Sequence, residues 1–304
     1  MPVQPEQSII KVLAYFDIFN YPLTPDEIYE YLDQPVPMDM VMAMLLQLVE
    51  EKRIFRLGSF YSLQADPALH VRRITGNHKA AILLKTAYKV GGFLYQFPYV
   101  RGIGISGSLS KNYADQQADI DFFVITHSNR LWIARTFMHL FKKLTYLTGH
   151  QHWFCMNYYI DEEALRIEEQ NIFTATELIT LLPVCGNGTM QKFYDQNSWV
   201  ADYFPHQVPG RQSMLLRRSG WCKQTIEWLF NNRLGNGLDN LFMRITTRRW
   251  KKKEYRFKTN GHGDRMGLCT GKHFSKPNPA FFQKKVLSMF EKKLKEKHNV
   301  NVMM

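Results

Sequence analysis

Two aspartates separated by a single isoleucine, Asp119 and Asp121, occur near the middle of the chain in the segment ADIDFFVI (118–125). The apolar residues around them predict a buried strand, in which residues two apart point to the same face. Two carboxylates on one face repel each other, and burying them without a partner is unfavourable. A divalent cation would offset this repulsion, and Mg²⁺ favours such oxygen ligands together with substrate phosphates.

A glycine–serine step, Gly107-Ser108, precedes the aspartates and follows a short apolar run, VRGIGIS at 100–106. The run predicts a buried strand, and a glycine at its end lets backbone N–H groups approach a ligand closely. The hydroxyls of Ser108 and Ser110 add further hydrogen-bonding groups. We therefore expect Gly107, Ser108 and Ser110 to bind phosphate groups. Lys111 is a further phosphate candidate, and its ordinary alternative is a solvated surface lysine.

The segment GSLSKNYADQQADID (107–121) resembles the signature of the DNA polymerase beta-like nucleotidyltransferase superfamily. In that signature a Gly-Ser pair is followed by a polar spacer and an acid–apolar–acid motif. The resemblance covers this segment in detail and residues 98–185 in layout. It implies a mixed sheet with helices, ATP or another nucleotide held at the Gly-Ser turn, and divalent metal (Mg²⁺ or Mn²⁺) at Asp119 and Asp121.

The next strand is predicted at HWFCMNYYI, residues 152–160. One face is expected to be buried and consists of Phe154, Met156, Tyr158 and Ile160. The other face presents Trp153, Cys155, Asn157 and Tyr159. The superfamily pattern expects a third carboxylate on this strand, and Asn157 occupies the best matching position, with Cys155 as the other option. An amide oxygen can coordinate a metal, but it cannot serve as the base for an attacking hydroxyl.

The absence of an evident third acid leaves several interpretations open. A carboxylate from elsewhere, Asp161 being the nearest, could complete the catalytic set of Asp119, Asp121 and Asn157. Alternatively, one metal suffices, or the site only binds its ligand. The first hypothesis is a Mg²⁺-dependent nucleotidyltransferase that moves a nucleoside monophosphate from ATP or another nucleoside triphosphate to an unknown acceptor. The alternative is a catalytically inactive protein of the same fold that binds a nucleotide or a nucleic acid.

The N-terminal residues 1–65 predict three helices followed by a hairpin. The segment LTPDEIYEYL opens the second helix with a capping box, because Thr24 is followed by Pro25 and by Glu27 three residues on. This order of elements resembles a winged-helix domain. The third predicted helix carries several acidic residues and few side chains that could read DNA bases, so we expect a packing or protein-contact module.

The whole chain is predicted to be an α+β protein. Its expected parts are the winged-helix-like module at 1–65, a connecting helix at 66–95, a nucleotidyltransferase-like mixed sheet with flanking helices at 96–185, and a basic helical region at 186–304. Residues 211–258 contain 13 Lys and Arg against three acids, which accounts for most of the net charge of +12. This segment predicts contact with RNA, another nucleic acid or an acidic acceptor, or else a solvated basic surface. Its interleaved aromatic residues are expected to be mostly core.

Membrane and secretory classes are not supported by the sequence. The chain contains no apolar run of the roughly 18 residues that span a bilayer, and its first residues do not form a signal-peptide pattern. The four cysteines are widely spaced, which predicts reduced thiols in a cytoplasmic protein. Two histidines near the predicted third strand, His150 and His152, are expected to be ordinary surface residues.

Overall fold

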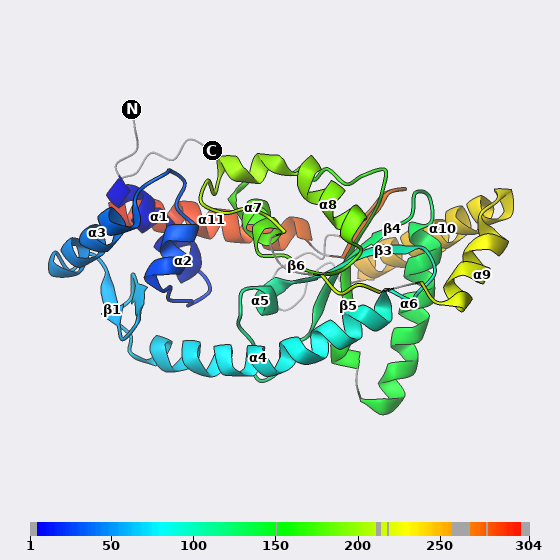
Figure 1. Ribbon diagram of the computed structural model, residues 1–304, viewed down its shortest axis with the longest axis horizontal. Helices are drawn as coiled ribbons and strands as arrows, with labels where there is room; N and C mark the ends of the chain where they lie inside the picture. Colours follow the sequence, from blue (N-terminus) through cyan, green and yellow to red (C-terminus); the bar gives the residue numbers. More distant parts are fainter. Residues whose placement is uncertain are drawn as a thin grey trace.

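A mixed six-stranded sheet forms the centre of the computed structural model, which describes residues 5–149, 151–210, 214–217, 219–256, 268–277 and 279–298 (Figure 1). In spatial order its strands are β6 (Leu182–Cys185), β3 (Val100–Ser106), β4 (Asp121–Thr126), β5 (Cys155–Asp161), β8 (Phe274–Pro277) and β7 (Leu268–Thr270). Strands β4 and β5 are parallel, and the other neighbours are antiparallel. The predicted α+β class with a mixed sheet is confirmed.

Both faces of the sheet are buried, which explains the continuous apolar run in β4. Phe122 and Val124 belong to one hydrophobic cluster, whereas Phe123 and Ile125 belong to another on the opposite face. The first cluster includes residues of α4 (Ala68–Leu94) and α6 (Leu131–Thr145). The second includes residues of α7 (Ile172–Ile179) and α8 (Asn187–Gln196). Alternate side chains of β4 therefore enter two different cores.

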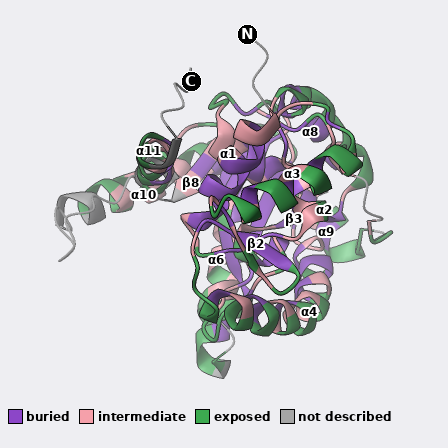
Figure 2. Ribbon diagram, turned by 90° about the vertical axis from the view of Figure 1, so that its left-hand side faces the viewer, coloured by how far each residue is buried: buried purple, intermediate pink, exposed green. Residues whose placement is uncertain are grey.

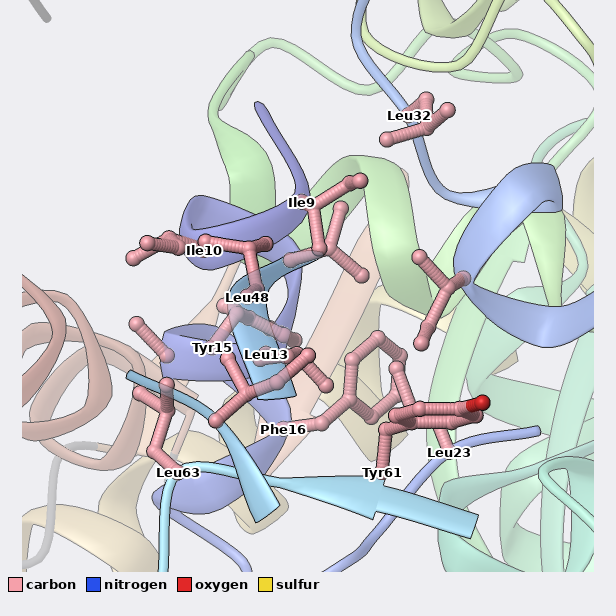
Figure 3. Packing of buried hydrophobic residues seen from close by; sticks show 14 of the residues in the cluster. Ile9, Ile10, Leu13, Tyr15, Phe16, Leu23, Leu32, Leu48, Tyr61 and Leu63 are labelled. Carbon is pink, nitrogen blue, oxygen red and sulfur yellow. The ribbon is translucent and has the colours of Figure 1, made fainter. Parts of the chain in front are cut away.

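The N-terminal module consists of α1 (Pro5–Asp17), α2 (Pro25–Glu30), α3 (Met38–Glu50) and the hairpin of β1 (Phe55–Leu57) and β2 (Phe60–Ser62). The predicted capping box is confirmed, because Thr24 and Glu27 exchange both of its hydrogen bonds. Figure 3 shows Leu13, Phe16, Leu23 and Tyr61 converging in its core. Figure 2 shows that α1 is largely buried, whereas α4 carries an exposed outer surface.

The C-terminal helix α11 (Pro279–His298) packs against this N-terminal module (Figure 1). Val286, Phe290 and Leu294 join the same hydrophobic cluster as α1, and Lys293 forms an ion pair with the buried Asp17. The expectation of a helical region at 186–304 is corrected by two strands within it, because β7 and β8 extend the central sheet. Both features depend on contacts between distant parts of the chain, which local periodicity does not report.

The basic segment contains α9 (Trp221–Phe230) and α10 (Arg233–Arg256), at the end of the molecule opposite the N-terminal module (Figure 1). The expectation that its aromatic residues are mostly core is wrong for Trp221 and Trp228, which are 77% and 79% exposed. Trp250 instead packs over the buried guanidinium of Arg135, 4.8 Å from the ring centroid. In the described ranges, no helix is both long and apolar enough to cross a membrane.

Four short helical elements connect the longer helices and strands. They are α5 (Gly107–Ser110) and the 3₁₀ helices η1 (Tyr146–Thr148), η2 (Gln151–Trp153) and η3 (Ser198–Asp202). All four cysteines are unpaired thiols, with Cys155 and Cys185 buried and Cys222 and Cys269 exposed.

Candidate active site

The Gly-Ser turn follows the end of β3, and this end lies beside the start of β4 in the sheet. Ser106, the last residue of β3, is directly opposite Asp121, the first residue of β4. Gly107 has a φ of +72°, and a Cβ at this position would lie 2.6 Å from Oδ2 of Asp121. Glycine is therefore required twice here, by the left-handed backbone and by the close approach of a carboxylate.

The carboxyl group of Asp121 lies in an environment that disfavours its charge. Burial, followed by the negative charges of Asp119 and Glu177, raises the pKa of Asp121 from 3.8 to about 6. The positive charges of Lys142 and Lys111 act in the opposite direction but do not cancel this effect. The electrostatics at the head of β4 thus favour the arrival of a cation.

Asp119 does not share a strand face with Asp121, which corrects the expected geometry. Strand β4 begins only at Asp121, so Asp119 lies in the preceding loop with its side chain 43% exposed. It accepts a hydrogen bond from Nδ1 of His152 at 2.7 Å in the tautomer that makes this nitrogen a donor. His152 is at the surface as expected, and it also makes this contact with a candidate metal ligand. His150 lies outside the described residues.

Asn157 is brought to the site, since its side-chain amide donates a hydrogen bond to Oδ1 of Asp121. The pairing of β4 with β5 shifts register between Phe122 and Phe123, and Asn157 is the residue that this irregularity leaves exposed. The expected alternation along β5 is therefore only partly observed. Tyr159 and Cys155 are buried together with Met156 and Ile160, because helices cover both faces of the sheet.

Asp161 cannot supply the missing carboxylate at this site. It is paired with Thr126 at the other end of β4, whereas Asp121 is paired with Cys155. Its side chain is fully buried and accepts hydrogen bonds from the backbone of Asn129 and from His273, both at 2.9 Å. This carboxylate stabilises the loop before α6.

A carboxylate that the sequence analysis did not select, Glu177 of α7, lies at the site. Its Oε1 is 2.8 Å from Nζ of Lys111, which also donates to the carbonyl oxygen of Gly107 at 3.1 Å. The helix is capped by Asn171, whose side chain accepts a hydrogen bond from the backbone N–H of Thr174. The only signal for Glu177 in the sequence was its place on a short amphipathic helix.

The two serines of the turn have different environments. Ser108 is exposed and lines a cavity, whereas Ser110 is buried and its hydroxyl donates to the carbonyl oxygen of Gly107 at 2.8 Å. Ser110 therefore stabilises the turn through this hydrogen bond. Of the residues predicted to bind phosphate, Gly107, Ser108 and Lys111 line the cavity.

This cavity, here called the turn cavity, measures about 410 Å³ and lies between the N-terminal module and the sheet. One wall contains Gly107, Ser108, Lys111, Asp121 and Glu177. Aromatic side chains form much of the rest, namely Tyr15, Phe16, Phe19, Tyr21, Tyr113 and Phe282. Arg72 and Asp115 complete the lining, and the Arg72 guanidinium lies 4.6 Å from the Tyr113 ring centroid. The cavity thus combines charged groups with flat apolar surfaces.

The donor set fits a metal that is bound together with a phosphorylated ligand. Within the described part of the chain, no three His, Cys, Asp or Glu side chains are grouped so that they could hold a metal ion by themselves. Protein-bound Mg²⁺ is commonly held by one or two carboxylates plus substrate phosphates, with water completing its shell. Asp121 and Asp119 would be the carboxylates of such a site.

Comparisons with models of protein families, with curated proteins and with solved structures found no match for this chain. The candidate site is a carboxylate-lined cavity at a Gly-Ser turn, with a lysine and several aromatic rings around it.

Proposed function

We propose that the chain is a Mg²⁺-dependent nucleotidyltransferase that transfers a nucleoside monophosphate from ATP or another nucleoside triphosphate to an acceptor. The observation that carries this proposal is the turn cavity, where Asp121, Glu177 and Lys111 meet the Gly-Ser turn beside aromatic side chains. Triphosphates need cations and hydrogen-bond donors, and nucleobases stack on aromatic rings. The cavity offers all three kinds of group.

The residues have separate roles in this proposal. Ser108 and Lys111 contact the triphosphate, and Asp121 with Asp119 would hold Mg²⁺. When bound, the metal would polarise the transferred phosphate and offset its charge. Rings such as Phe19 and Tyr113 provide stacking surfaces for the base.

Glu177 takes the role of the third carboxylate. The acceptor oxygen forms a bond to the α-phosphorus while the bond from that phosphorus to the pyrophosphate oxygen breaks, and pyrophosphate leaves with the electron pair. The acceptor proton passes to the carboxylate of Glu177, which forms an ion pair with Lys111 in the ligand-free protein. A base on a neighbouring helix thus compensates for the amide at Asn157.

The order of elements supports the proposal of a nucleotidyltransferase-like sheet and a winged-helix-like N-terminal module. Strand β3, the Gly-Ser turn, β4 and the parallel β5 follow the layout of a nucleotidyltransferase-like sheet, and three helices plus a hairpin suit a winged-helix-like module. We propose that this module packs and closes the turn cavity, because Tyr15 and Phe16 of α1 line it. The basic α9–α10 pair is proposed to contact an acidic partner or nucleic acid.

The proposal is tested by calorimetric titration of the full chain with ATP and Mg²⁺, and by transfer of label from α-³²P-ATP to acceptors. Glu177→Gln is expected to retain Mg-ATP binding and to lose transfer by about two orders of magnitude, as expected for loss of a general base. The control is Glu163→Gln, because Glu163 follows the far end of β5, is exposed and does not line the turn cavity. Absence of Mg-ATP binding by the wild type would refute the proposal.

The alternative is a protein that binds a nucleotide without transferring it, and Asn157 in place of an acid is the observation that favours it. In that case, Mg-ATP binds, but neither a labelled acceptor nor released pyrophosphate is detected. An unchanged rate of transfer in Glu177→Gln would instead leave the enzyme intact and exclude Glu177 as its base.

A further inference from the structure

A second cavity, here called the apolar cavity, adjoins the turn cavity. It measures about 260 Å³ and shares Gly107, Glu177 and Phe282 with the turn cavity. It lies between the sheet face that carries Phe123 and the helices α7 and α8. Glu177 lines both cavities, so a molecule in the apolar cavity would contact the proposed general base of the turn cavity.

The lining of the apolar cavity is mostly aromatic and aliphatic. Phe123, Phe173, Phe193, Leu178 and Leu181 are among its wall residues. Its polar groups close to Asp121 are Asn157 and Ser106, both of which hydrogen-bond with that residue. Polar groups therefore meet the ligand at the reacting end, and apolar groups surround its body.

The charged groups of the apolar cavity are already paired. Nζ of Lys276 lies 2.8 Å from Glu169 and 4.8 Å from the Tyr158 ring centroid, and Glu177 pairs with Lys111. Because apolar side chains surround most of this cavity, a strongly charged or polyhydroxylated acceptor would replace only part of its hydrogen bonds to water there. The volume is also below the roughly 300–1,000 Å³ that is typical for drug-sized ligands.

We propose that the apolar cavity binds the acceptor, and that the acceptor is a small alcohol with an aromatic or branched apolar body. This inference rests on the proposed nucleotidyltransferase activity and adds the class of its second substrate. The acceptor hydroxyl lies at the Glu177 end, loses its proton to that carboxylate and forms the O–P bond as pyrophosphate departs. The product is a phosphodiester in which one phosphate joins the nucleoside to the alcohol.

The test uses the full chain with α-³²P-ATP, Mg²⁺ and a series of alcohols: benzyl alcohol, 2-phenylethanol, 3-phenylpropanol, glycerol and a short RNA with a free 3′ hydroxyl. The phenylalkanols are expected to be labelled, with kcat/KM rising about fourfold per methylene until the cavity is full. Glycerol is expected to react at least tenfold more slowly than 2-phenylethanol. Preferred labelling of the RNA or of glycerol would overturn the inference.

Variants in α7 give an independent measure of cavity occupancy. Leu178→Phe is expected to reduce kcat/KM for 3-phenylpropanol at least tenfold without changing the Kd of Mg-ATP, whereas Leu178→Ala shifts the preference toward longer alcohols. Ile179→Phe is the matched control, since Ile179 is the next residue of α7 and lines neither cavity. Should Leu178→Phe fail to fold, Gln283→Trp fills the cavity from α11, because the side chain of Gln283 is half-buried and lines the cavity.

The possible failures are distinguishable. A wild type that does not bind Mg-ATP refutes the proposed function itself. A wild type that binds Mg-ATP and transfers label, but whose acceptor profile is the same in Leu178→Ala, Gln283→Trp and Ile179→Phe, refutes only the assignment of the acceptor.

Discussion

Replacing Asp121 by Asn is expected to stabilise the ligand-free protein and to abolish Mg-dependent nucleotide binding. The side chain is partly buried near Asp119 and Glu177, so its negative charge is unfavourable in the folded state. Asn has nearly the same shape and carries no charge. The substitution also changes one hydrogen bond, which reduces the gain in stability. The Asn157 amide, which donates to the Asp121 carboxylate in the wild type, pairs with a second amide in the variant.

The magnitude follows from the pKa of Asp121. The difference between 3.8 and about 6 corresponds to roughly 3 kcal/mol of unfavourable free energy for the charged form. Because the pKa of Asp121 is higher in the folded than in the unfolded protein, the protonated carboxyl group favours the folded state. This contribution to the free energy of unfolding is fully present below pH 3.8 and is lost as pH rises through about 6. At pH 7.5 we expect Asp121→Asn to raise the free energy of unfolding by about 1–3 kcal/mol, after the altered hydrogen bond is subtracted.

Thermal and urea unfolding at pH 7.5 and pH 4.5 measure this difference. The gain of Asp121→Asn is expected to shrink at pH 4.5, where the wild-type carboxyl is largely protonated. Saturating Mg-ATP at a hundredfold excess over Kd should stabilise the wild type by about 2.7 kcal/mol and leave the variant unchanged. Asp195→Asn, at an exposed position of α8, serves as the control for removal of a surface charge.

A destabilised Asp121→Asn variant, together with a wild type that does not respond to Mg-ATP, would refute this reasoning. That pattern would mean that the Asp121 carboxylate is stabilised by partners in the folded protein, because removing one member of a buried charge pair is strongly unfavourable. Asp121 would then be a structural residue.

Three further predictions test other parts of the structure. Gly107→Ala is expected to cost at least 1 kcal/mol and to abolish the Mg-ATP effect in thermal melts, because of the positive φ and the contact with Asp121, whereas Gly188→Ala, with no atom within 4 Å of its Cβ, should change stability by less than about 1 kcal/mol. Burial and the charges of neighbouring basic residues lower the pKa of His139 from 6.5 to about 3. The unfolded chain therefore binds this proton first as pH falls, so the contribution of neutral His139 to the free energy of unfolding is fully present above pH 6.5 and should fall by about 2 kcal/mol between pH 7.5 and pH 5. Urea unfolding of His139→Leu should lack most of this fall, and an identical pH profile would contradict the assignment. Lys293→Met is expected to destabilise the protein by about 1–3 kcal/mol in urea melts, because it removes the ion-pair partner of buried Asp17. An unchanged free energy of unfolding would show that this ion pair does not stabilise the contact between α11 and the N-terminal module.

The sequence alone determined those features that depend on neighbouring residues. The capping box at Thr24 was predictable because both of its partners lie within one helical turn. The existence of a strand after the two aspartates, although not its start, and the turn at Gly107 were predictable because an apolar run and a glycine constrain the local backbone directly. These signals were sufficient for the α+β class and for the cavity residues of the turn.

Tertiary structure decided which side chains meet at the site. Glu177 reaches Lys111 from a helix that follows two strands later, and α11 closes the core of α1 from the other end of the chain. The start of β4 at Asp121 placed Asp119 in a loop, although the spacing of the two residues suggested a shared strand face. Periodicity describes the direction of a side chain relative to its own element. The distances between elements depend on how their apolar faces pack, and that packing is a property of the whole chain.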